Sequence, residues 1–219
     1  MRTSLHAAAV RAAFVGMLAT LLAGCVHVGP EADAPAIRRH ALDLLPPPTV
    51  QLPDGVHTLA VRDFDSRRRY EARVVRRTPE GALTFLENER FVEDPRECVT
   101  TVVREALAQS GAFRLVVPAS GGFETDLLLD GNVLAFDLVE PKSGPWTAHL
   151  ALRLTLADAH GGVLSSAALD AERPLPGPSP EGLGPALGAC LREVLDRALA
   201  AWREAGVLTG DPAPDSRAR

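Results

Sequence analysis

The residue types most able to do chemistry are three cysteines, six histidines and two neighbouring aspartates. The histidines are scattered, and none lies three or four residues from another: His6, His27, His40, His57, His149 and His160. No H-E-x-x-H or C-x-x-C spacing is present, and the carboxylates do not cluster at metal-ligand spacing. The sequence therefore predicts no metal site and no cofactor.

A catalytic site has equally little support. Asp63 and Asp65, at the end of a predicted strand, come closest to an acid pair, but no base or nucleophile is matched to them. His149 falls on the predicted wet face of a strand, where we expect a surface residue. No G-x-S-x-G elbow is present, and in the glycine-rich segment 182–188 Pro185 removes a backbone donor that phosphate binding would need. We therefore expect no catalytic residues and no enzyme.

Cys25 is predicted to carry lipid, because it ends an export signal. A short basic start is followed by an apolar run over 12–22 and then by Leu22-Ala23-Gly24-Cys25, which resembles the bacterial lipobox. The alternative is a plain secretory signal, or an apolar helix, that happens to contain a cysteine. Several acyl chains such as palmitate would anchor the mature protein, since each buried methylene contributes about 0.8 kcal/mol. Val26, in place of the Asp that favours inner-membrane retention, predicts the outer membrane, facing the periplasm.

Composition and proline placement divide the chain into four parts. With 23 Lys+Arg against 28 Asp+Glu and a net charge of -5, nucleic-acid binding is not expected. Residues 1–24 are the predicted signal peptide, and 25–55 are an acylated, proline-rich tether in which only 36–45 has the composition to dock. Residues 56–205 form the predicted folded body, since 46% of the chain is hydrophobic. Residues 206–219 are a predicted flexible tail.

Hydrophobic periodicity gives the order of elements in the body. Asp94-Pro95-Arg96-Glu97 predicts a helix start, with Asp as cap and Pro at the first helical position, and Gly111 marks its end. A second amphipathic helix is predicted over 185–205. The predicted strands cover 58–64, a hairpin over 70–76 and 83–87, 113–117, 126–139 with a bulge or bend at Gly131, 149–156 and 163–172. This order predicts an α+β fold, a two-layer sandwich of a mostly antiparallel sheet with both helices on one face.

Two further groups have both a structural and a functional interpretation. Cys98 and Cys190 lie on the apolar stripes of the two predicted helices and would be either a disulfide or two buried thiols. The arginine-rich hairpin would be either a solvated surface or a contact for an acidic partner or anionic lipid headgroups: Arg67, Arg68, Arg69, Arg73, Arg76 and Arg77.

Four segments resemble one family. They are His40-Ala41-Leu42-Asp43, the strand Leu59-Ala60-Val61-Arg62-Asp63-Phe64, Glu89-Arg90-Phe91, and the helix end Leu107-Ala108-Gln109-Ser110-Gly111-Ala112-Phe113. Together with the lipobox, they resemble the ABC-type transport auxiliary lipoproteins, and among these the PqiC-type outer-membrane lipoproteins that accompany MCE-family lipid transport systems.

The resemblance implies a non-enzymatic auxiliary domain over 56–205, with a fold akin to the amino-terminal domain of TolB. It implies an adaptor role in lipid transport between the inner and outer membranes. The implied partners are a periplasmic MCE protein and the outer membrane, with a homo-oligomer left open. An outer-membrane lipoprotein that regulates a periplasmic cell-wall synthase is the alternative, because it would share the anchor, the tether and the α/β body.

Overall fold

The computed structural model describes residues 36–42, 55–66, 70–177 and 179–208. The chain divides into two units after Ala36, and every element below belongs to the second, which begins at Ile37. The predicted signal peptide, Cys25, Arg67, Arg68 and Arg69 lie outside the described residues, as do most of the tether and of the tail. Neither described helix is both long and apolar enough to cross a bilayer.

The two helices begin and end close to where the sequence predicts. Helix α2 spans Pro95–Gln109, and the Asp94 side chain caps it by accepting a hydrogen bond from the backbone N–H of Arg96. Gly111, with a φ of 70°, leads the chain out of it in a left-handed conformation. Helix α3 spans Leu183–Glu204 and buries the predicted apolar stripe together with Leu183 and Leu199. Both helix predictions are confirmed to within two residues.

The sheet is organised around β7 (Leu127–Val139). One edge of β7 pairs antiparallel with β8 (Thr147–Asp158), which pairs antiparallel with β9 (Val163–Pro174). The other edge pairs in parallel with three strands in turn, which are β2 (Thr58–Val61), β3 (Asp65–Ser66) and β4 (Arg73–Arg77). One stretch of chain therefore runs alongside most of the length of β7.

Three further strands extend this side of the sheet. β6 (Leu115–Pro118), followed by the short 3-10 helix η1 (Ala119–Gly121), pairs in parallel with β2. β5 (Leu83–Phe91) forms the predicted hairpin with β4 and also pairs in parallel with β1 (Arg38–His40). The outermost strands on this side are therefore β6 at one place and β1 at another.

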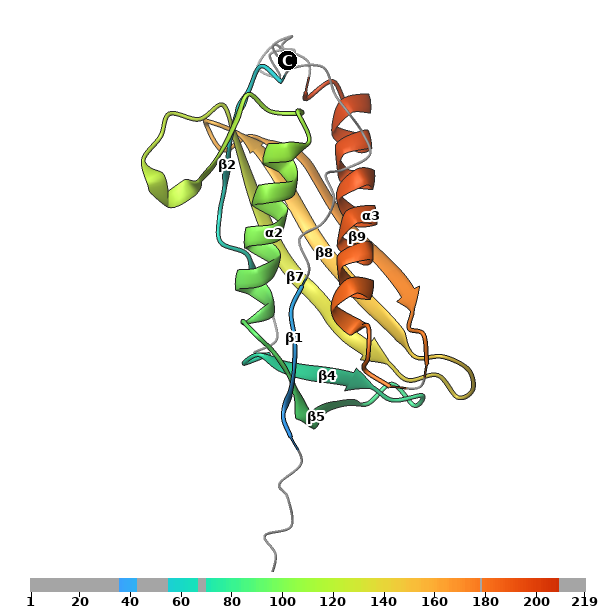
Figure 1. The fold of residues 1–219 in the computed structure, drawn as a ribbon. Coiled ribbons are helices and arrows are strands. Elements are labelled where there is room, and N and C mark those ends of the chain that lie inside the picture. Colours follow the sequence, from blue (N-terminus) through green and yellow to red (C-terminus); the bar gives the residue numbers. More distant parts are fainter. Residues whose placement is uncertain (1–35, 43–54, 67–69, 178, 209–219) are drawn as a thin grey trace, which may run out of the picture. The chain divides into compact units, whose positions relative to one another are not determined.

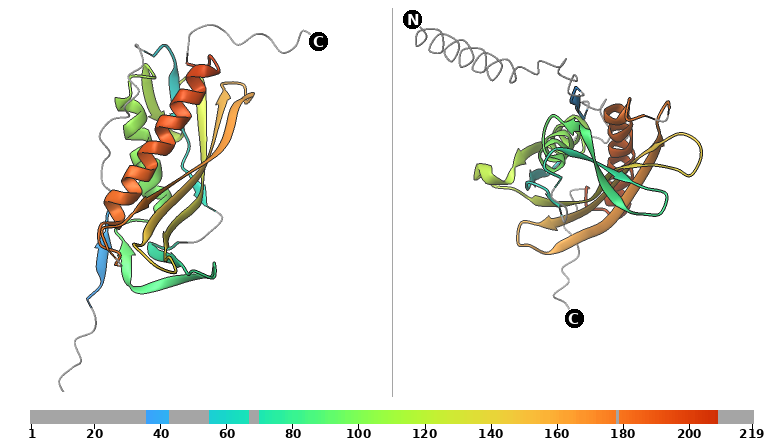
Figure 2. Two further views of the ribbon diagram at one scale, coloured as in Figure 1. Left: turned by 90° about the vertical axis from the view of Figure 1, so that its right-hand side faces the viewer. Right: turned by 90° about the horizontal axis from the view of Figure 1, so that it is seen from below.

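The fold is α+β, and its sheet is curled and mixed. Among the described strands three pairings are antiparallel and five are parallel. The expectation of a mostly antiparallel sheet therefore holds for β7, β8 and β9 and for the β4–β5 hairpin, but not for the other pairings of the strands that precede β7. Local alternation of apolar residues does not encode strand direction, which depends on the order in which distant segments pair. Both helices lie along the concave face of the sheet, α2 over β7 and α3 over β8 and β9 (Figures 1 and 2).

The core lies between this concave face and the helices. It contains the alternating leucines of β8, Leu150, Leu152, Leu154 and Leu156, which face Leu187, Leu191 and Leu195 of α3. The folded unit begins before the predicted start at residue 56, because β1 joins the sheet. At the other end Leu208, only 9% exposed, packs on the core beyond the predicted end at residue 205.

The bulge or bend predicted at Gly131 lies slightly further along β7. The register of β7 against β8 shifts between Val133 and Ala135, so the irregularity lies beyond the glycine. A Cβ at Gly131 would lie 2.3 Å from atoms of the Phe64 ring. Glycine is therefore required here for the close approach of Phe64 to the sheet.

Candidate functional site

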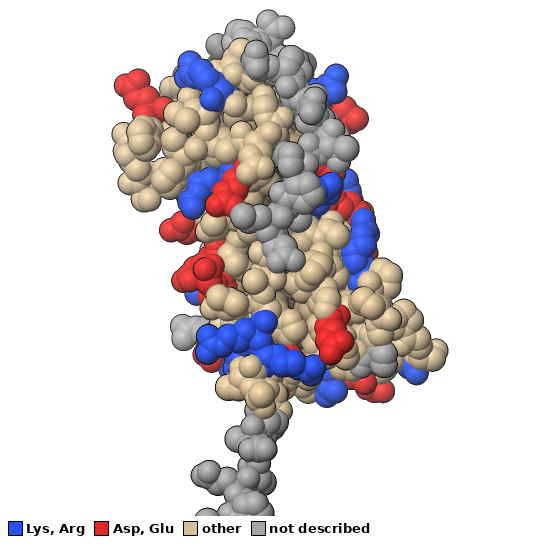
Figure 3. Space-filling view, in the orientation of Figure 1, with Lys and Arg blue, Asp and Glu red and all other residues tan. Residues whose placement is uncertain are grey.

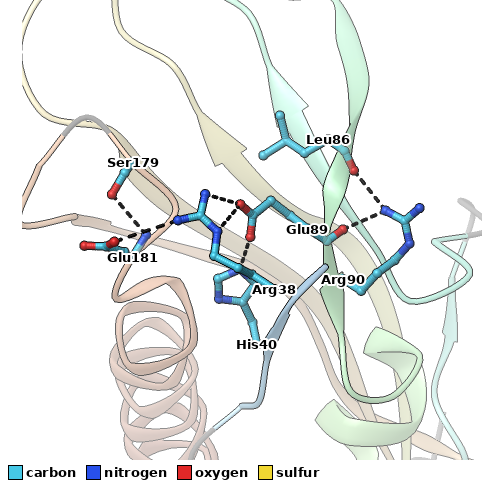
Figure 4. A network of polar contacts seen from close by, with 7 residues as sticks. All are labelled: Arg38, His40, Leu86, Glu89, Arg90, Ser179 and Glu181. Carbon is cyan, nitrogen blue, oxygen red and sulfur yellow. Dashed lines mark hydrogen bonds and ion pairs between the residues drawn. The ribbon is translucent and has the colours of Figure 1, made fainter. Parts of the chain in front are cut away.

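A buried carboxylate holds the first strand of the unit in place. Glu89 of β5 is only 4% exposed, and β1 brings two basic side chains to it. Arg38 Nε donates to Glu89 Oε1 at 2.8 Å, while His40 Nε2 lies 2.7 Å from Oε2 (Figure 4). The exposed Glu181, just before α3, lies 3.8 Å from the Arg38 guanidinium. We call these four residues the Glu89 network.

Backbone contacts complete the attachment of β1. The parallel register places Arg38 opposite Glu89 and His40 opposite Phe91, and the N–H of Val92 donates to the His40 carbonyl at 2.9 Å. The chain then passes against α3, where a Cβ at Gly184 would lie 2.1 Å from the Ala41 carbonyl oxygen. β1 and the residues after it are thus held between β5 and the first turn of α3.

A cavity of about 190 Å³ opens beside this strand. The end of β1 and the two residues after it line one side, the end of β5 and the loop after it a second, and one face of α2 a third: His40, Ala41, Leu42, Phe91, Val92, Glu93, Cys98, Thr101, Val102 and Glu105. Its lining is mainly apolar, with the carboxylates of Glu93 and Glu105 among it. Such a lining suits an apolar side chain better than an anion.

Cys98, on the wall of this cavity, and Cys190 are both free thiols in the structure. The Cys98 Sγ donates to the Pro95 carbonyl at 3.4 Å, and the Cys190 Sγ donates to the Ala148 carbonyl at 3.6 Å. Burial raises the pKa of each thiol to about 12. A disulfide would require both side chains to leave these separate partners, and the pairing stays a prediction.

The described arginines of the hairpin are engaged within the protein. Arg77 contacts the buried Asp137 carboxylate at 2.6 Å, while Arg76 lies 3.5 Å from Glu140. Arg73 pairs with Glu71 at 2.9 Å, and its guanidinium carbon lies 3.8 Å above the centre of the Phe85 ring. These contacts give each of the three a structural role, and a partner or headgroup contact stays a prediction.

The other residues with predicted chemistry do not come together. Asp63 lines a hollow of about 320 Å³ beside α2 with Arg96 and Arg104. Asp65 is exposed and accepts a hydrogen bond from the N–H of Ser66. His149 lies on β8, half-buried. Among the described residues no three His, Cys, Asp or Glu side chains are placed to hold a metal ion.

Charge is evenly mixed over the face that carries the helices. In Figure 3 basic and acidic side chains are interspersed there among the described residues, without a large field of one sign. This agrees with the small net charge of -5.

The family of the chain follows from residues 70–198. Over this range it matches the family described as the ABC-type transport auxiliary lipoprotein component. The match runs from β4 into α3 and covers more than half of the chain. This protein belongs to the ABC-type transport auxiliary lipoprotein family. None of the curated proteins matches the chain.

Two solved structures share the fold of this family member. A Xanthomonas campestris protein of family DUF330 superposes with a TM-score of 0.67 at 17% identity, covering 78% of this chain and 97% of its own. A second, described only as an uncharacterized protein, gives 0.53 at 16% identity, with 77% and 98% covered. PelC from Paraburkholderia phytofirmans gives only 0.40 at 16% identity, with 66% and 89% covered.

Two features of this auxiliary lipoprotein were missed by sequence reasoning. Glu89 was recognised only as part of the family-like segment 89–91, because its bases lie about 50 positions away along the chain. Gly184 was considered only as part of the glycine-rich segment 182–188, whereas it makes room for Ala41. The signals that pointed here were the family-like segments at 89–91 and at 40–43, the second of which begins with the last residue of β1.

Proposed function

We propose that this protein is an outer-membrane lipoprotein that acts as a non-catalytic adaptor of an MCE-type ABC lipid transport system. Acyl chains on Cys25 fix it under the outer membrane, facing the periplasm. The folded unit docks the periplasmic MCE protein. The observation that carries the proposal is the family match over residues 70–198, which covers β4 to β9, all of α2 and most of α3.

Two features of the chain support this role. The lipobox-like Leu22-Ala23-Gly24-Cys25 supplies an anchor, so membrane attachment needs no spanning helix. The folded unit also exposes large apolar side chains on separate elements, among them Phe85 (44%), Phe123 (58%) and Val163 (64%). Exposed apolar groups of this kind are common where a protein contacts a partner.

Photo-crosslinking in living cells tests the adaptor role. A photoreactive amino acid is placed at Phe85, Phe123 or Val163, and adducts are identified by mass spectrometry. We expect an MCE-family protein in the adducts from at least one of the three positions. The matched control is Arg39, an exposed residue of β1, where we expect no such adduct.

Membrane fractionation tests the anchor independently. Cys25→Ser should abolish labelling by radioactive palmitate and move the chain out of the outer-membrane fraction. Adducts with a cell-wall synthase, and none with a transport protein, would contradict the lipid-transport proposal. Palmitate labelling that survives Cys25→Ser would contradict the anchor alone.

A further inference from the structure

β1 is attached mainly by polar contacts and buries little apolar surface. Ile37 is 57% exposed, and Arg38 and Arg39 are both exposed. Leu42 is the residue of this segment that packs, half-buried, against the core. The attachment therefore depends on the Glu89 network, three residues of backbone ladder and the fit at Gly184.

β5 has a second partner besides β1. It keeps its antiparallel pairing with β4 on its other edge. A short edge strand with few buried apolar contacts belongs to the least stable end of a protein's local structure. We therefore expect β1 to open before the core does.

Because β1 lies between Cys25 and the rest of the folded unit, its release would lengthen the chain that links the two. With β1 docked, 13 residue steps separate Cys25 from Arg38, which span at most about 45 Å when fully extended. With β1 released, the next described contact with the fold is at Gly55, whose N–H donates to the Gly111 carbonyl at 3.1 Å. The 30 steps from Cys25 to Gly55 span at most about 100 Å.

We propose that β1 is a releasable clamp that sets how far the folded unit can stand from its lipid anchor. Docked, the strand holds the unit within the short reach. Released, it adds its own length and that of the chain up to Gly55 to the tether. The contacts of Arg38 and His40 with Glu89 hold the strand in the docked position. Without them, a carboxylate that is only 4% exposed would lose both of its basic partners. The change of reach rests on the proposed acylation of Cys25, whereas the clamp itself does not.

Limited trypsin digestion of the full mature chain tests the clamp. Trypsin cleaves after Arg38 and Arg39 only when this backbone leaves the sheet, and mass spectrometry identifies the cut. We expect Glu89→Gln to speed this cleavage at least tenfold. The matched control is Glu87→Gln, an exposed carboxylate two residues away on the same strand, which should leave the rate unchanged.

A second variant undocks β1 without altering any charge. Gly184→Ala places a Cβ against the Ala41 carbonyl and should also speed cleavage at least tenfold. Gly177→Ala, where a Cβ meets nothing within 4 Å, is its control. Cleavage after Arg153 of β8 reports opening of the core and should stay unchanged in all four variants. Unchanged cleavage after Arg38 and Arg39 in both Glu89→Gln and Gly184→Ala would overturn the clamp.

Neutron reflectometry of the acylated chain on a supported bilayer measures the reach. We expect the protein layer to extend further from the membrane in Glu89→Gln than in Glu87→Gln. Equal layers, with cleavage accelerated, would show that release does not change the reach and would overturn that part of the proposal. Failure of the chain to attach to the bilayer would instead count against the anchor in the proposed function.

Discussion

β1 and β2 are both short, parallel strands of one sheet, yet they are held in opposite ways. All four residues of β2 are buried, with Leu59 0% and Val61 1% exposed, and the strand lies between β6 and β7. β1 lies at the edge, pairs only with β5 among the described strands, and leaves Arg38 and Arg39 exposed. Burial of apolar side chains holds the first, and charge pairing holds the second.

The two strands differ in what their contacts contribute: those of β2 stabilise the whole fold, whereas those of β1 attach one strand to it. Apolar burial contributes to the global free energy of unfolding in proportion to the area removed from water. A polar contact at a sheet edge gives much less, because the same groups can bind water when the contact breaks. We therefore expect changes in β2 to unfold the protein and changes in β1 to release one strand.

The largest effect is expected from Leu59→Ala. Removing most of a fully buried leucine should lower the free energy of unfolding by about 3 kcal/mol, from lost burial and the cavity left behind. Urea denaturation followed by circular dichroism measures this. Ile37→Ala, just before β1, is the control and should change it by less than about 0.5 kcal/mol, since that side chain is 57% exposed. An equal fall in the free energy of unfolding in Leu59→Ala and Ile37→Ala would show that β2 is not held by apolar burial more strongly than β1 is.

A smaller loss is expected from Gly131→Ala, which tests the connection that follows β2. The new Cβ would displace the Phe64 ring and should cost about 1–3 kcal/mol. Phe64→Leu removes the ring that clashes, so the loss in the double variant should be less than the sum of the two single losses. Strict additivity in urea denaturation would show that the close approach to Phe64 is not the cause.

The same contrast explains which parts of the fold could be predicted from sequence. The start of α2 was predicted because Asp94, Pro95 and Glu97 act on their immediate neighbours. The leucines of β8 were predicted because their alternation is local too. β1 escaped prediction as a strand, since Arg38-Arg39-His40 has no apolar alternation and its partner Glu89 is 51 positions from Arg38.

The direction of the early strands and the contacts between distant residues could not be predicted from the sequence, for the same reason. The parallel pairing of β2 with β7 joins Leu59 to Leu127, and no local pattern records it. The arginine hairpin was visible as a run of charge, but its partners, such as Asp137 for Arg77, lie on another strand. Candidate site residues were therefore recognised by type, while their pairing needed the fold.

Arg38→Ala and Arg39→Ala sharpen the comparison within β1 itself. Arg38 contacts Glu89, whereas Arg39 is exposed and points to no described acidic partner. Arg38→Ala should lower the free energy of unfolding by at least about 1.4 kcal/mol, the equivalent of a tenfold change in opening, and Arg39→Ala by less than about 0.5 kcal/mol. Hydrogen exchange at the Val92 amide, which donates to the His40 carbonyl, should become at least tenfold faster in Arg38→Ala only. Exchange at Leu59 should stay unchanged, and acceleration there as well would mean that β1 and β2 open together.

The ionisation of the two thiols, Cys98 and Cys190, should make stability depend on pH in alkaline solution but not near neutrality. Burial holds the pKa of Cys98 and of Cys190 at about 12, above the ordinary value of about 8.5. Above about pH 9 the unfolded chain loses these protons before the folded one does, so stability should fall as pH rises from 9 towards 12.

At pH 8 both thiols should react slowly with iodoacetamide, because the thiolate is the nucleophile. Glu89→Gln should speed labelling of Cys98, beside β1, and leave that of Cys190 unchanged, as peptide mass spectrometry can check. Equal acceleration at both would show that loss of β1 loosens α3 as well.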